Sequence, residues 1–321
     1  NLNNIFLKDF KILDPNYNLK IGSKPHGEQT ALMMIGIEKI LSTSPLKAIL
    51  VYGDTNSALA GALAGSKFHD VCVIHLEAGL RSFEIKMPEE TNRKAIDHIS
   101  DILITTTTIA KNFLIKEGIK KKTIFISGNT IVDAIKLHKA KIDSNFNLLK
   151  DYNLNKNNYF LLTLHRQENV EGKNKFLKIY KSLEKISTNL QMDIIFPAHP
   201  RTQKLIKSLN IKFNKKIKII EPVNYLNFLT LINNSRLVIT DSGGIQEESC
   251  TMRVPTITLR TSTERQETVN MGANILSKYD YNSLFKNITA MLNKKIKWEK
   301  PYGSGNASEK IYNILKKLKK I

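Results

Sequence analysis

The sequence lacks the features that mark membrane, secreted and metal-bound proteins. It contains no apolar run near the ~18 residues that a membrane-spanning helix requires, and no secretory signal is visible. It has only 2 cysteines, Cys72 and Cys250, and no CxxC or Cys/His spacing that would indicate a metal site. Both lie in apolar or helical segments, so we expect buried free thiols in a reducing cytoplasm.

Acidic residues are scarce relative to basic ones. The chain has 29 Asp and Glu against 49 Lys and Arg, which gives a net charge of +20. Such a charge permits nucleic-acid binding. However, the lysines alternate with Ile and Leu at helical spacing, as on solvated helix faces, and no nucleic-acid-binding motif is present. We interpret the charge as mostly surface composition, with a share that suits an anionic ligand, and keep nucleic-acid binding as a distant alternative.

What the chain does contain is a repeated alternation of apolar strands and helices, which predicts parallel sheets with crossover helices. Strands are expected at 48–52, 71–75, 102–105 and 123–127, and in a second series at 160–164, 193–196, 217–220, 237–240 and 256–259. Residues 141–158 between the two series are rich in Asn, Lys and Asp, which predicts a boundary between domains 1–150 and 151–305. The predicted fold class is α/β, with two doubly wound, Rossmann-like domains facing a cleft.

The stretch from His75 to Arg93 follows an apolar strand and is rich in carboxylates. Glu77 comes just after the strand, and Glu89 and Glu90 follow a proline at the start of the next helix. Asp54 ends the preceding strand, so Asp54 and Glu77 are expected to be neighbours at the carboxyl edge of the sheet. Carboxylates gathered in a cleft can divide acid and base roles. The plainer interpretation of Asp54 is a helix N-cap.

The loop Asp241-Ser-Gly-Gly predicts an anion site in the second half. Ser242, Gly243 and Gly244 lead directly into a helix, whose N-terminus suits a phosphate. Glu248 lies further along that helix and fits a ribose diol, and Arg265 could contact a diphosphate. An ordinary strand-to-helix turn and a surface ion pair are the structural alternatives.

Two histidines end strands of the second series. His165 begins HRQEN and His199 lies in PAHPRT. A histidine at this edge can donate to a leaving phosphate or transfer a proton. For either residue alone, a structural hydrogen bond is the commoner explanation.

A set of motifs then identifies a family. GDTNSALAGALAG, HLEAGLRS, MPEETNR, GNTIVDA, LHRQENV, HPRT, TDSGGIQEES and TERQETV, in this order, resemble the non-hydrolysing UDP-N-acetylglucosamine 2-epimerases. The resemblance implies a glycosyltransferase-B type fold, with a C-terminal helix at 306–321 returning to the first domain. It implies cytoplasmic homodimers that use no metal or redox cofactor and no membrane or nucleic-acid partner. It also implies interconversion of UDP-GlcNAc and UDP-ManNAc through elimination and re-addition of UDP, supplying sugars for polysaccharide synthesis.

The resemblance assigns roles by motif. Asp54, Glu77 and Glu89 resemble the acid/base carboxylates, and His165 resembles a histidine near the diphosphate. The UDP-binding residues would be Ser242, Gly243, Gly244, Glu248 and Arg265. Candidate second-site or cleft residues are His26, Gln29, His199 and Arg201. The family's opening strand and Gly-Thr-Arg-Pro-Glu loop have no counterpart here, so a preceding segment is expected to be missing from the chain as printed.

Two rival substrates or reactions stay open. One is 2-epimerisation of UDP-2,3-diacetamido-2,3-dideoxyglucuronate, a branch in which GDTNSAL also occurs. The other is the hydrolysing epimerase, which releases free ManNAc, although HLEAGLR and PEETNR favour the non-hydrolysing branch.

Overall fold

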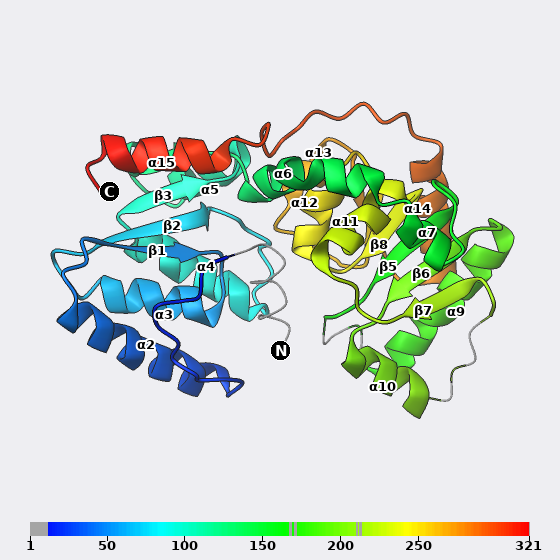
Figure 1. Ribbon diagram of the computed structural model, residues 1–321, viewed down its shortest axis with the longest axis horizontal. Helices are drawn as coiled ribbons and strands as arrows, with labels where there is room; N and C mark the ends of the chain where they lie inside the picture. Colours follow the sequence, from blue (N-terminus) through cyan, green and yellow to red (C-terminus); the bar gives the residue numbers. More distant parts are fainter. Residues whose placement is uncertain (1–11, 167–168, 170–171, 210, 212–213, 321) are drawn as a thin grey trace. The chain divides into compact units, whose positions relative to one another are not determined.

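A computed structural model describes residues 12–166, 169, 172–209, 211 and 214–320, which form two compact α/β units (Figure 1). Residues 12–133 and 301–320 form the first domain, and residues 134–300 form the second. The long helix α6, Thr130–Ser144, runs across residues 133 and 134. Composition predicts a boundary near residue 150, whereas the compact units divide inside this helix, because Ile135 and Ile142 of the helix belong to an apolar cluster of the second domain.

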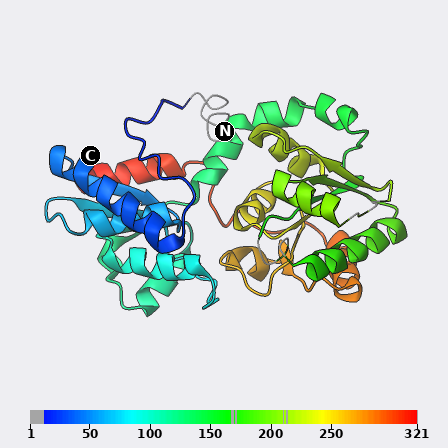
Figure 2. The ribbon, with the colours of Figure 1, turned by 90° about the horizontal axis from the view of Figure 1, so that it is seen from below.

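The first domain is built on a parallel sheet in the order β1-β2-β3-β4. Its strands are β1 Ala48–Tyr52, β2 Cys72–Ala78, β3 Ile102–Thr105 and β4 Ile124–Ile126. The connecting helices are α3 Asn56–Gly65, α4 Pro88–Ile99 and α5 Thr108–Lys116, and α2 His26–Thr43 precedes β1. Helix α15, Ala307–Lys317, packs on the opposite face of the sheet from α3 (Figures 1 and 2).

Side-chain alternation explains these two layers. Val73 faces Ala58 and Ala62 of α3, whereas its neighbour Ile74 faces Leu315 of α15. Helix α3 is rich in small residues because it lies very close to the sheet. A Cβ on Gly61 would come within 2.9 Å of Val51 Cγ1, so a larger side chain there would push the helix away.

The second domain contains a parallel sheet in the order β10-β9-β8-β5-β6-β7. The strands are β5 Tyr159–Thr163, β6 Asp193–Pro197, β7 Ile217–Ile220, β8 Leu237–Thr240, β9 Thr256–Thr258 and β10 Asn274–Leu276. The helices are α7 Asn147–Asp151, α9 Lys173–Asn189, α10 Pro200–Ser208, α11 Tyr225–Asn234, α12 Gly243–Thr251, α13 Gln266–Asn270 and α14 Tyr281–Leu292. Helices α9, α10 and α14 pack through one apolar cluster, and α7, α11 and α12 pack through a second.

The strand order of the second domain creates a switch point. From β5 the chain adds β6 and β7 on one side and then returns to place β8 against the other side of β5. Loops leaving two such strands diverge, which opens a crevice at their carboxyl ends where ligands bind in doubly wound sheets. The α/β class with two parallel sheets is confirmed.

The predicted strands are found with small shifts. Strand β2 continues to Ala78, beyond the predicted end at residue 75, because Glu77 takes a left-handed conformation in a bulge against β3 and lets pairing resume at Ala78. Strand β10 and helices α7 and α13 were not predicted, since each has at most five residues.

Candidate functional site

The first group of predicted site residues lies at the carboxyl edge of the β1–β4 sheet. Tyr52 pairs with Leu76, so Asp54, just after β1, and Glu77, in the bulge near the end of β2, lie at the same edge of the sheet. Gly53 donates its N–H to Leu76 O at 3.0 Å, and both Gly53 (φ +70°) and Glu77 (φ +65°) adopt left-handed backbone. A left-handed glutamate is uncommon and strained, which is typical of functional positions.

The Asp54 carboxylate is held by an arginine from helix α4. Arg93 Nε and Nη2 donate to Asp54 Oδ2 at 2.8 and 2.6 Å, and Arg93 Nη1 donates to Glu90 Oε2 at 2.7 Å. Asn92 on the same helix donates to the Asp54 carbonyl at 2.9 Å. The roles of Asn92 and Arg93 were not predicted. The only signal for them in the sequence was their spacing, because each lies three residues after one of the two glutamates and side chains at this spacing are neighbours on a helix.

Glu77 has different neighbours. Tyr52 donates its phenol to Glu77 Oε1 at 3.1 Å and lies 3.0 Å from Thr130 Oγ1. A small pocket at this edge is lined by Tyr52, Glu77, Thr106 and the Ser127–Thr130 turn. Glu77 is half-buried at this pocket, a setting in which a carboxyl can meet both a ligand and a hydrogen-bond donor.

The two glutamates at the start of α4 occupy opposite environments. Glu89 is exposed in the first helical turn. Glu90 is buried and accepts from the backbone N–H and the hydroxyl of Ser82, each at 2.9 Å. Burial alone would raise the pKa of Glu90, but the Ser82 bonds and the Arg93 guanidinium lower it below its ordinary value. Glu90 therefore stabilises the loop that contains Ser82, whereas the carboxyl of Glu89 is accessible to a ligand.

The predicted second-site residues of helix α2 lie against this region. The Asn56 amide lies 3.0 Å from His26 Nδ1 and donates to Gln29 Oε1 at 2.8 Å. Asn92 in turn donates to Asn56 Oδ1 at 3.3 Å. A surface pocket beside these residues is lined by His26 and Asn56 and by Pro88, Thr91 and Asn92 of α4. The start of α2 is thus linked through Asn56 to the helix that presents Glu89.

The second group of predicted residues lies at the β5/β8 switch point. His165 follows β5, and its Nδ1 lies 2.8 Å from Asp241 Oδ1. Asp241 follows β8, is fully buried and accepts from the backbone N–H of His165 and of Arg166 and from Asn169 Nδ2. Burial alone would raise the pKa of Asp241, but His165 and these donors lower it. Asp241 thus orients His165, whose side chain is 55% exposed at this edge.

Helix α12 begins directly beside this pair. Ser242 is the N-cap residue, and Gly243 and Gly244 form the first turn, where backbone N–H groups are unsatisfied within a helix. A Cβ on Gly243 would come within 2.4 Å of Glu264 Oε1, whereas the space around Gly244 is open to 4 Å. The turn therefore presents bare backbone, as anion-binding helix starts do.

Arg265 and Glu248 are both largely buried. Arg265 Nε lies 2.9 Å from Glu247 Oε1, and its Nη1 lies 3.4 Å from Glu264 Oε1. The ion pair considered from the sequence is thus a buried one. Burial raises the pKa of Glu248 to about 7, against a hydrogen bond from Tyr225 that favours the anion. Glu248 can therefore either donate or accept a hydrogen bond near neutral pH.

The remaining predicted residues lie along the same sheet. His199 is exposed after β6, and Arg201 lies in the first turn of α10.

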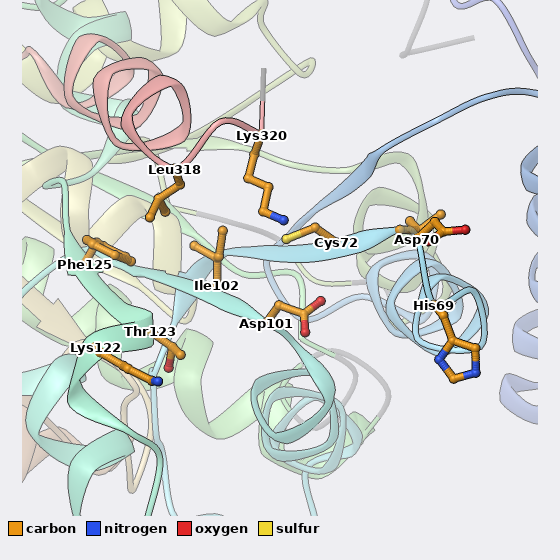
Figure 3. Close-up of a pocket in the computed structure, with 11 residues that line it drawn as sticks. His69, Asp70, Cys72, Asp101, Ile102, Lys122, Thr123, Phe125, Leu318 and Lys320 are labelled. Carbon is orange, nitrogen blue, oxygen red and sulfur yellow. The ribbon is translucent and has the colours of Figure 1, made fainter.

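Another pocket of the first domain lies at the opposite, amino edge of the sheet (Figure 3). It is lined by Cys72, Asp101, Lys122 and Lys320 and contains none of the predicted site residues.

Both cysteines are buried and free. Within the part of the chain that the structure describes, no cluster of His, Cys, Asp or Glu could hold a metal. None of the described helices is long and apolar enough to cross a membrane.

Comparison with known proteins gives consistent matches along the chain. Residues 1–316 match the family model described as UDP-N-acetylglucosamine 2-epimerase. The protein of that name from Methanocaldococcus jannaschii is 49% identical, over 98% of this chain and 87% of the relative. Its crystal structure with UDP-GlcNAc and UDP superposes with a TM-score of 0.90, over 98% of this chain and 88% of that one. A UDP-2,3-diacetamido-2,3-dideoxy-D-glucuronate 2-epimerase from Pseudomonas aeruginosa is 37% identical, over 99% of this chain and 88% of the relative.

Proposed function

The chain belongs to the UDP-N-acetylglucosamine 2-epimerase family, and from this premise we propose that it interconverts UDP-GlcNAc and UDP-ManNAc by eliminating and re-adding UDP. The protein is an isomerase that acts on UDP-GlcNAc. The observation that carries the proposed route is the set of carboxylates at one sheet edge, where Asp54 follows β1 and Glu77 lies in the bulge near the end of the adjacent β2.

The chemistry explains why carboxylates are needed. The C2 proton of the sugar has no adjacent carbonyl to acidify it, so its removal must accompany departure of UDP from C1. A carboxylate takes the C2 proton as the C1–O bond breaks, and the bonding electrons leave with UDP. The product is 2-acetamidoglucal, with a C1=C2 double bond. Delivery of a proton to the other face of C2 and return of UDP to C1 give the epimer.

We assign the acid/base work to Asp54, Glu77 and Glu89. The Arg93 guanidinium pairs with the Asp54 carboxylate and orients it, which suits a base. Glu77 shares its hydrogen bond with the Tyr52 phenol, which suits a group that gains and loses a proton. The exposure of Glu89 leaves its carboxyl available to the sugar.

We assign the leaving group to the second domain. The N–H groups at the start of α12 and the Ser242 hydroxyl would hold the diphosphate, and Arg265 would add positive charge nearby. His165, oriented by Asp241, would donate to the departing phosphate. Glu248 would hydrogen bond to the ribose hydroxyls.

The deciding experiment is incubation with UDP-GlcNAc in deuterated water, followed by NMR of the C2 position. We expect deuterium at C2 of both epimers, because the proton removed from one face exchanges with solvent before another is delivered. Epimerisation without deuterium at C2 would refute the elimination route. Free ManNAc and UDP as the end products would instead indicate the hydrolysing reaction.

A second candidate is the corresponding 2-epimerisation of UDP-2,3-diacetamido-2,3-dideoxyglucuronate, which the relative from Pseudomonas aeruginosa favours. A panel of the two UDP sugars under identical conditions separates the candidates. Turnover of the uronate without turnover of UDP-GlcNAc would replace our proposal.

We further propose that the protein works as a cytoplasmic homodimer without a nucleic-acid partner. The buried free thiols of Cys72 and Cys250 suit a reducing compartment. Light scattering of the purified protein tests the dimer. A DNA gel shift persisting at about 200 mM salt, with a steep salt dependence, would count against the absence of a nucleic-acid partner.

A further inference from the structure

A buried histidine lies directly behind the proposed acid/base residues. His75 lies in β2, between β1 and β3, and is 1% exposed. Its Nδ1 lies 2.7 Å from Asp97 Oδ1, and its Nε2 lies 2.9 Å from the Gly53 carbonyl oxygen. The imidazole therefore joins helix α4 to the turn that carries Asp54.

Both partners of the ring accept hydrogen bonds. A carbonyl oxygen has no hydrogen to donate, and Asp97 itself accepts from Gly79 N–H and lies 2.7 Å from Arg81 Nη1, as an ionised carboxylate does. A neutral imidazole has a single N–H. Its other ring nitrogen carries a lone pair, which would then face the lone pairs of an acceptor oxygen and repel it. Turning the ring over would place C–H groups at both positions. The geometry therefore requires both ring nitrogens to carry hydrogen.

The charges around the ring support the same conclusion. Arg81 is fully buried and pairs with both Asp97 and Glu117. Arg81 is thus shared between two carboxylates, and an imidazolium at His75 supplies a second cation beside the buried Asp97; Glu117 is 25% exposed, so solvent screens part of its charge. The other titratable neighbour, His98, is 51% exposed and lies 3.8 Å from Glu117, where solvent screens it.

His75 and Asp97 hydrogen bond to the backbone beside both proposed acid/base residues. His75 binds the carbonyl of Gly53, which directly precedes Asp54. Asp97 binds the N–H of Gly79, just beyond the left-handed Glu77. We propose that His75 is an imidazolium and a positioning residue, holding Asp54 and Glu77 at the separation that the C2 proton transfers need. This role rests on the proposed function.

The charge state can be tested in the unaltered protein. We would label histidine with ¹⁵N and assign the His75 ring signals by their loss in His75→Asn. At neutral pH we expect both ring nitrogens of His75 to carry a proton. A signal from one unprotonated ring nitrogen would overturn the imidazolium assignment, and this result does not depend on activity.

Kinetics test the positioning role. His75→Asn keeps a donor near the Nδ1 position and His75→Gln keeps one near Nε2, so each preserves one of the two contacts. We expect kcat to fall on the order of 10- to 100-fold in both, as small misplacement of catalytic groups produces, with KM changing less than about twofold. C2 deuterium exchange should slow in parallel. His98→Asn, at the exposed neighbouring histidine, serves as the matched control and should retain wild-type rates.

The outcomes separate the two proposals. Wild-type kcat in correctly folded His75→Asn and His75→Gln, with folded protein measured by active-site titration with UDP, would overturn the positioning role alone. Absence of C2 exchange in the wild-type protein would overturn the elimination route and the positioning role together. The nitrogen signals would still establish or refute the imidazolium.

Discussion

Replacing Arg93 is expected to destabilise the first domain selectively. The guanidinium is nearly buried and lies between Asp54 and Glu90, at 2.6 and 2.7 Å. Arg93→Met keeps much of the apolar stem but removes the charge and every donor. Glu90, 3% exposed, would then be a buried anion held by Ser82 and by the backbone N–H of Phe83, without a compensating charge.

The expected cost follows from the burial of each partner. Removing one member of a buried ion pair costs about 3–5 kcal/mol, because the remaining charge is left uncompensated. The Asp54 carboxylate is 27% exposed, so its share is expected to be small, roughly 0–1 kcal/mol. The hydrogen bonds that Glu90 accepts from Ser82 and from Phe83 N–H persist, so the total loss of unfolding free energy should lie near the lower end, about 3 kcal/mol.

The loss of stability in the first domain can be measured separately from the stability of the second domain. Amide hydrogen exchange of peptides covering β1 and β2 reports the opening free energy of the first domain. The chain's 1 tryptophan, Trp298, is buried in the second domain, so its fluorescence reports that domain separately. Lys94→Met removes the same charge from an exposed position of the same helix and should cost less than about 0.5 kcal/mol.

The pH dependence provides a further check. The pKa of Glu90 is lowered in the folded protein, so its contribution to stability is fully present above the unfolded value, near 4.5, and is lost as pH falls through the folded value. The cost of Arg93→Met should therefore be largest near neutral pH and shrink below about pH 4.5. A loss under about 1 kcal/mol, or one that is the same at pH 4 and pH 7, would refute this account of the Asp54–Arg93–Glu90 network.

Three further predictions concern single carboxyl groups. Glu89→Gln should lower kcat by roughly 10²–10⁴-fold with an unchanged melting temperature, whereas Glu90→Gln should lower the melting temperature; the reverse pattern would exchange their roles. The pKa of Glu248 is raised to about 7, so its proton stabilises the fold fully below about 4.5 and this contribution is lost as pH rises through 7. The free energy of unfolding of Glu248→Gln, measured by denaturant unfolding, should therefore exceed that of the wild type by up to about 3 kcal/mol at pH 8 and equal it near pH 4.5. An equal difference at both pH values would contradict the raised pKa. Asp241→Asn should disorient His165 and lower kcat about 10- to 100-fold while UDP affinity, measured by calorimetry, changes little; unchanged kcat would exclude that role.

Local patterns were sufficient to predict the fold class and the strands that carry the site. Parallel strands buried on both faces produce continuous apolar runs, and the intervening helices carry their own start signals, so the α/β alternation is visible in the sequence. Asp54 and Glu77 could be named as neighbours because each follows a strand of the same series, and successive parallel strands end at the same edge.

The partners of those residues depend on contacts between distant segments. Glu89 and Glu90 are adjacent in sequence, yet only Glu90 meets Ser82 and Arg93, because the rotation of α4 against the sheet turns one side chain inward and leaves the other in solvent. The pairing of His165 with Asp241 likewise requires β8 to return beside β5. The sequence alone determined which residue types follow the strands. Strand order and helix packing determined which charges are paired, because each pair joins residues from segments that are far apart in the sequence.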